Sequence, residues 1–160
     1  MNVSAADAQR VDALLGSEIA ALRAFVSVLQ EEQQALAAGQ LERLLPLAQD
    51  KTQLSEKLSA LDDDRMRAVG WRDAADHSEE MAAWLQSAGQ PHLDIAWRQL
   101  LELAAQARDL NAMNGRLIAE RMRHNQQALA ILLAAGDAAD LYGPDGQPRL
   151  GNRGRSLGSA

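Results

Sequence analysis

The sequence predicts an all-α fold in which a long antiparallel helical hairpin is joined by a third long helix. Apolar residues recur at helical spacing in three long stretches, and most glycines and prolines fall between or after them. Aromatic residues make up only 3% of the chain, while hydrophobic residues make up 47%. The core must therefore consist of aliphatic side chains, which pack well between helices. We expect one elongated helical bundle over residues 1–136 and a flexible tail over residues 137–160.

Residues 5–38 are predicted to form the first long helix. Gly16 is the only helix breaker in this stretch, and Gly39 is placed to end the helix. Its leucines recur every seven residues, and two β-branched residues four positions later widen the apolar stripe: Leu15, Leu22, Leu29 and Leu36, with Ile19 and Val26. This stripe is typical of an amphipathic helix that packs against a neighbour.

A second helix is predicted over residues 41–69. Pro46 suits its first turn, Gly70 is placed to end it, and leucines again repeat at seven residues. The short break at 39–40 makes the first two helices an antiparallel hairpin. The following connection, residues 71–90, is more polar, and we expect a short helix near 78–87 with Ser78 as its N-cap.

The third long helix is predicted over residues 91–135, with Pro91 in its first turn and Gly136 at its end. Beyond it, six of the eleven glycines fall in residues 136–160. Such a segment buries too little apolar surface to offset its ordering entropy, so we expect disorder. Three arginines make the end of this tail locally basic, and the sequence assigns them no role: Arg149, Arg153 and Arg155.

Composition argues against several classes of protein. The net charge of −6 disfavours a general nucleic-acid binder, and the absence of cysteine removes disulfides, thiolate catalysis and cysteine-based zinc sites. The N-terminus lacks the features of a signal peptide, and no apolar run is long enough to span a membrane. We expect a cytoplasmic protein that makes no stable membrane insertion and binds no nucleic acid.

No catalytic, metal or cofactor site is predicted. Glu120 and His124 lie one turn apart, but the Glu-x-x-x-His spacing occurs once and differs from that of a di-metal helical bundle. The run at residues 62–64 cannot converge on one ion, because adjacent helical residues point about 100° apart. For both features a solvated surface is the favoured interpretation, and we expect that the protein is not an enzyme.

The heptad leucines allow two interpretations. They could form a coiled-coil oligomer, in which case the protein would be a self-assembling structural protein. They could instead pack within the chain. The stripe of the first helix is wider than a strict zipper seam, which favours packing within the chain.

Polar residues on the third helix mark a candidate binding face. Asn111, Asn114 and Asn125 lie on or beside an apolar stripe, and Gly115 falls inside the helical pattern at a cost of roughly 1 kcal/mol against alanine. One interpretation is a close helix crossing at Gly115 with asparagine fixing the register. The other is a groove for a partner helix. The face is wider than one seam needs, because it includes Leu110, Met113 and Leu117 beside Ile118, Met122, Leu129 and Leu132.

The only tyrosine, Tyr142, lies in the turn-rich segment 141–147, where little can bury it. Aromatic rings anchor interfaces because they bury a large area with few torsions to fix. An aromatic residue outside any expected core is a candidate contact for another protein.

Several short motifs together resemble the FlgN family of flagellar export chaperones. The resemblance is carried by Trp97, Arg108-Asp109-Leu110-Asn111, Asn114-Gly115, Asn125-Gln126-Gln127-Ala128-Leu129, and Leu141-Tyr142-Gly143 followed by Asp145-Gly146-Gln147. It implies a cytosolic chaperone for the hook–filament junction proteins, hook-associated proteins 1 and 3. The chaperone would bind a C-terminal amphipathic helix of these proteins and deliver them to the cytosolic domain of the flagellar type III export-gate protein, without a cofactor.

The resemblance, with the wide face of the third helix, suggests two sets of site residues. The substrate would be bound by Leu110, Asn111, Met113, Asn114, Gly115, Leu117, Ile118, Met122, Asn125 and Leu129. Docking on the export gate would depend on Tyr142, with Leu141, Gly143, Asp145 and Gly146 around it.

Overall fold

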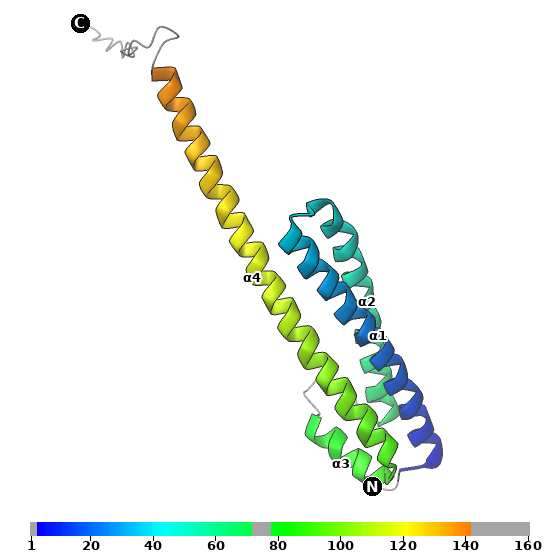
Figure 1. Ribbon diagram of the computed structural model, residues 1–160. Coiled ribbons are helices and arrows are strands. Elements are labelled where there is room, and N and C mark those ends of the chain that lie inside the picture. The colour runs from blue at the N-terminus through cyan, green and yellow to red at the C-terminus, as the bar shows by residue number, and fades with distance from the viewer. Residues whose placement is uncertain (1–2, 72–77, 142–160) are drawn as a thin grey trace, which may run out of the picture. The chain divides into compact units, whose positions relative to one another are not determined.

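The computed structural model describes residues 3–71 and 78–141, and these residues form helices without any strand. The elements, in chain order, are α1 (Ala5–Ala38), the 3-10 helix η1 (Leu41–Arg43), α2 (Leu44–Ala68), α3 (Ser78–Ala88) and α4 (Pro91–Leu141). Figure 1 shows α1 and α2 as the two arms of a hairpin. The predicted all-α class and the helical hairpin are confirmed.

The first helix has the bounds that its sequence predicts, because both of its ends are capped. Ser4 Oγ accepts a hydrogen bond from the backbone N–H of Asp7 at 3.1 Å, which satisfies a free donor of the first turn. At the other end Gly39 adopts a left-handed φ of 73°, and the N–H of Gln40 donates to the carbonyl of Ala35. This turn stops α1 and starts the hairpin.

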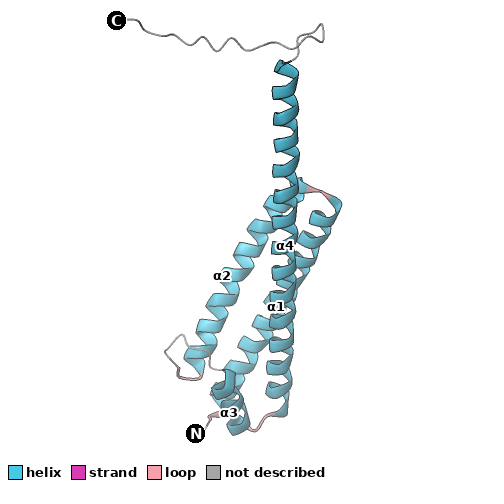
Figure 2. Cartoon of the chain, turned by 90° about the vertical axis from the view of Figure 1, so that its left-hand side faces the viewer, coloured by secondary structure: helices cyan, strands magenta, loops and turns pink. Residues whose placement is uncertain are grey.

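The second helical stretch begins with a 3-10 turn, so α2 itself starts at Leu44 and not at residue 41. Pro46 lies in its first turn, as predicted. Gly70, at a φ of 84°, follows its last turn, and the N–H of Trp71 donates to the carbonyl of Met66. In Figure 2 the two arms of the hairpin run side by side again, seen from another direction.

The last two helices differ in detail from the prediction. Ser78 was predicted as the N-cap, which is the residue just before a helix. It is instead the first helical residue of α3. The prediction that Gly136 ends the last helix is wrong, because α4 continues to Leu141. Glycine lowers helix stability by only about 1 kcal/mol, and the alanines around Gly136 are strong helix formers. Most of the predicted tail, residues 142–160, lies outside the described residues.

The chain divides into a first unit, Met1–Leu117, and a second unit, Ile118–Ala160. The core lies in the first unit, where side chains from α1, α3 and α4 meet those at the end of α2. All four heptad leucines of α1 are buried, so this stripe packs within the chain: Leu15, Leu22, Leu29 and Leu36. In the second unit none of residues 118–136 is buried.

Candidate functional site

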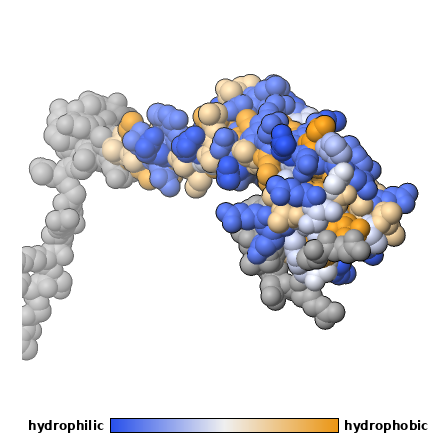
Figure 3. Space-filling view, turned by 90° about the horizontal axis from the view of Figure 1, so that it is seen from below, coloured by the Kyte–Doolittle hydropathy of each residue, from blue (hydrophilic) through white to orange (hydrophobic). Residues whose placement is uncertain are grey.

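The second unit carries an apolar stripe along α4 that no described residue buries. Ile118, Met122, Leu129 and Leu132 follow one another at spacings of four, seven and three residues, which keeps them on one face of a helix. Their exposed fractions are 38%, 58%, 57% and 68%. We call these four residues the α4 stripe. In Figure 3 orange and pale apolar residues lie among blue ones along this part of α4.

The remaining large apolar residues of the second unit lie beside or opposite the α4 stripe. Leu133 borders it, whereas Ile131 lies about 200° from Leu129 on an ideal helix and is 69% exposed. Exposed apolar residues at regular spacing, in contrast to single scattered ones, are typical of an interaction site. The α4 stripe is therefore the candidate site in this unit.

The predicted site residues of the first unit have unequal environments. Leu110 and Leu117 are half-buried, and Asn111 is exposed. The thioether of Met113 accepts a hydrogen bond from Gln33 Nε2 of α1 at 2.8 Å. The interpretation that helices cross closely at Gly115 is wrong, because a Cβ added there would meet nothing within 4 Å.

Asn114 is the most buried of the predicted site residues, with 1% of its surface exposed. Its Nδ2 donates to the carbonyl oxygen of Leu29 and to Glu32 Oε2, each at 2.8 Å. Lys51 of α2 donates to the same carboxylate, at 2.9 Å from Oε1. Lys51 Nζ also lies 3.5 Å from Asn111 Oδ1. Asn114 thus holds α4 against α1, and Lys51 links the same carboxylate to α2, as the register interpretation of the asparagines predicts.

A second buried polar cluster surrounds Arg65 of α2. Arg65 Nε donates to Glu18 Oε1 of α1 at 2.8 Å, and its Nη2 pairs with Asp62. The guanidinium lies 5.0 Å from the ring centroid of Trp97 on α4, within the range of a cation–π contact. Burial raises the pKa of Glu18 above its ordinary value, although the charge and hydrogen bond of Arg65 oppose the shift.

These buried charges were not among the predicted site residues, yet the sequence contains a signal for them. Glu18 follows Leu15 by three residues, and Glu32 follows Leu29 by three. That spacing places both carboxylates on the apolar face of α1. A buried carboxylate needs a partner, so two acidic residues on a buried stripe predict two cations on a neighbouring helix.

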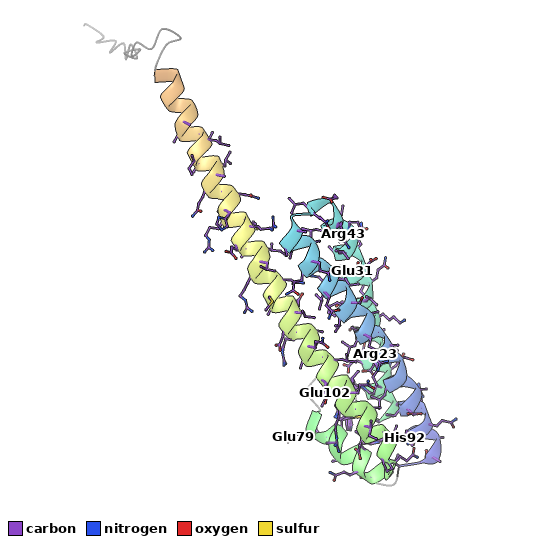
Figure 4. All side chains as sticks on the ribbon, in the orientation of Figure 1. Arg23, Glu31, Arg43, Glu79, His92 and Glu102 are labelled. Carbon is purple, nitrogen blue, oxygen red and sulfur yellow. The ribbon has the colours of Figure 1, made fainter. Side chains whose placement is uncertain are left out.

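The alternative sites do not form a group of potential metal ligands within the described residues. Glu120 and His124 face each other at 3.8 Å on an exposed surface, and no group of three potential metal ligands occurs in residues 3–71 and 78–141. Acidic residues near the end of α2 pair locally, as Asp64 does with Arg67 at 2.9 Å. Figure 4 labels a similar surface pair at the hairpin turn, Glu31 and Arg43. None of the described helices is both long and apolar enough to cross a membrane.

The predicted export-gate residues fall at the edge of the described chain. Leu141 is the last residue of α4 and was assigned to the tail. The other four lie outside the described residues: Tyr142, Gly143, Asp145 and Gly146. Their role in docking stays a prediction.

Comparison with known proteins gives a consistent family. The FlgN protein family model matches residues 1–149. A flagella synthesis protein FlgN of Yersinia enterocolitica is 28% identical over 143 residues, covering 88% of this chain and 90% of that protein. Those of Salmonella typhimurium and Escherichia coli K12 are 29% and 26% identical, each covering 91% of this chain and 94% of the relative. No solved structure gives a significant match. The chain therefore belongs to the FlgN family, whose matched members are named flagella synthesis proteins.

Proposed function

We propose that this protein is a cytoplasmic export chaperone for flagellar assembly. It binds the C-terminal amphipathic helix of hook-associated proteins 1 and 3, keeps these proteins unassembled, and presents them to the export gate. The proposal joins family membership to the α4 stripe. Binding and release require neither catalysis nor a cofactor.

The α4 stripe is the observation that carries the proposal. Its spacing suits an amphipathic helix that lays its own apolar face along α4, which is the helix-in-groove mode of recognition. Met122 adds a flexible side chain that can adapt to more than one partner. The partner would cover side chains that the described chain leaves exposed, so binding removes apolar surface from water.

The predicted residues of the first unit have two roles in this proposal. Leu110, Met113 and Leu117 are proposed as further substrate contacts within the first unit, with Asn111 and Gly115 near them in sequence. Asn114 acts indirectly, since its amide group is engaged with α1 and holds α4 in register. Tyr142 and its neighbours dock the loaded chaperone on the export gate.

Two substitutions on α4 test the assignment of the stripe. Leu129→Asp places a charge in the α4 stripe and is expected to weaken binding of a junction-protein C-terminal peptide by at least about tenfold, because a carboxylate must be desolvated. Ile131→Asp is the matched control, with the same new residue two positions away on the opposite side. Calorimetry measures both affinities, and circular dichroism checks that both variants are folded. Equal affinity of the two variants for the peptide would refute the role of the α4 stripe in binding.

A third variant, measured by the same calorimetry, separates cargo binding from docking at the export gate. Tyr142→Ala is expected to keep the peptide affinity and to weaken binding to the cytosolic domain of the gate protein.

Sedimentation of the wild-type protein tests its oligomeric state. A 1:1 complex supports a chaperone, whereas assembly of the free chain into large oligomers would favour the structural coiled-coil alternative. The burial of the α1 leucines within the chain argues against that alternative.

A further inference from the structure

One polar residue interrupts the α4 stripe. Asn125 follows Met122 by three residues and precedes Leu129 by four, so it lies on the same helical face, and it is exposed. A partner helix that covers the stripe also covers this amide. Desolvating an amide without a hydrogen-bond partner costs free energy, so the covering helix must either supply a partner or bind more weakly.

The first unit contains an asparagine on α4 that a helix does cover. Asn114 precedes Asn125 by eleven residues, which is about three helical turns and leaves the two within about 20° of each other on an ideal helix. The covering helix is α1, which accepts from Asn114 Nδ2 through the carbonyl oxygen of Leu29 and the carboxylate of Glu32. A carboxylate on a mostly apolar helical stripe is thus one of the two groups that accept from the amide N–H groups of such an asparagine in this chain, while Asn114 Oδ1 has no hydrogen-bond partner among the described residues.

The charge around Asn125 favours the same partner chemistry. Of the three arginines in residues 116–136, Arg121 lies next to the stripe, four residues before Asn125, whereas Arg116 and Arg123 lie on the opposite side of an ideal helix. A carboxylate that approaches Asn125 therefore comes near the positive charge of Arg121, whereas a lysine would be repelled. A second copy of the same segment would bring no carboxylate on its stripe.

We propose that Asn125 determines which helices the α4 stripe accepts. The preferred partner is an amphipathic helix whose apolar stripe carries one Asp or Glu, placed to accept a hydrogen bond from Asn125. The contact reproduces the one between Asn114 and Glu32, with Arg121 beside Asn125 as Lys51 is beside Glu32. This inference rests on the proposed function, because it treats the bound helix as cargo.

Three synthetic helical peptides test the proposal with the full-length chain. They share one leucine stripe and differ only at its central position, which is Glu, Leu or Lys. Wild-type protein is expected to bind the Glu peptide roughly tenfold more tightly than the Leu peptide, since hydrogen bonds to charged groups are among the stronger ones. It should bind the Lys peptide most weakly. In Asn125→Leu the order of the Glu and Leu peptides is expected to reverse.

Gln127→Leu is the matched control, because it removes an exposed amide from the opposite side of α4. It should keep the wild-type order of the three peptides. The proposal is overturned if wild-type protein binds the Leu or Lys peptide as tightly as the Glu peptide. It is also overturned if Asn125→Leu leaves the order unchanged, if no peptide binds, or if sedimentation shows a dimer that Leu129→Asp dissociates.

The two proposals can fail separately. A junction-protein helix that binds through Leu129 while the peptides show no preference for Glu would overturn the role of Asn125 and keep the chaperone function. Conversely, the protein could prefer the Glu peptide through Asn125 and yet bind no flagellar helix. That result would support the role of Asn125 and overturn the proposed cargo.

Discussion

Two buried glutamates on α1 each take part in contacts that reach both α2 and α4. Glu18 meets Arg65, which also contacts Trp97, and Glu32 meets Lys51 and Asn114. Buried charges of this kind add little net stability compared with apolar packing, but removing one partner is costly. Their contribution is to fix which side of α2 and α4 faces α1.

The buried position of Glu18 predicts a pH dependence of stability. Its pKa is raised above the ordinary value of 4.5 by burial, so the folded state holds the proton more tightly than the unfolded state. The resulting stabilisation is fully present below 4.5 and is lost as the pH rises through the folded pKa. Relative to Glu18→Gln, the wild type should therefore become more stable as the pH falls from 7 toward 4.5. Urea unfolding at several pH values measures this difference, and the opposite slope would contradict it.

Helix ends decide the architecture at the level of elements. Gly39 and Gly70 adopt left-handed backbone conformations just after α1 and α2, and both positions are correctly predicted as ends. Gly136 has no such conformation and lies within α4. Glycine allows a helix to end but does not enforce it, so the residues that follow and the cap hydrogen bonds decide.

The same substitution should have opposite effects at two glycines. Gly70→Ala is expected to cost about 1–2 kcal/mol, because its φ of 84° is unfavourable for any residue with a Cβ. Gly16→Ala, inside α1, is expected to stabilise by roughly 0.5–1 kcal/mol through higher helix propensity. A Cβ at either position would meet nothing within 4 Å, so steric clashes do not contribute to the difference between the two substitutions. Free energies of unfolding in urea check both signs, and a destabilised Gly16→Ala would refute the argument.

Stability and recognition are separated along the whole molecule. The buried cluster draws its residues from positions 8–107, while the stripe proposed to bind cargo begins at Ile118. Residues that hold the fold together are therefore distinct in sequence from most residues proposed to bind a partner. Substitutions in the second unit can change binding without disturbing the core.

A shortened chain tests this separation. A variant that ends after His124 keeps the whole first unit and about two further turns of α4, and its midpoint of thermal unfolding should stay within about 4 °C of the wild type. Leu93→Ala in the full chain is the contrast, because Leu93 is fully buried and its truncation should cost about 2–5 kcal/mol. Scanning calorimetry compares the two. A large loss of stability in the shortened chain would show that the second unit supports the first.

The helices, the hairpin and the family could all be predicted from the sequence. Heptad leucines, capping glycines and early prolines are local signals, and each acts through the backbone or through neighbours one turn away. The motifs from Trp97 to Gln147, which indicate the family, can likewise be recognised without knowing how the helices pack. The exposed α4 stripe could be foreseen as a wide apolar face.

Which parts of that face are covered could be seen only from the packing of the helices. Asn114 and Asn125 have the same side chain on the same helix, yet the first is buried against α1 and the second is exposed. The pairing of Glu32 with Lys51, and of Glu18 with Arg65, also required the packed hairpin, since 19 and 47 residues separate the partners. Periodicity assigns a residue to a face of its own helix, but burial depends on which other helix reaches that face.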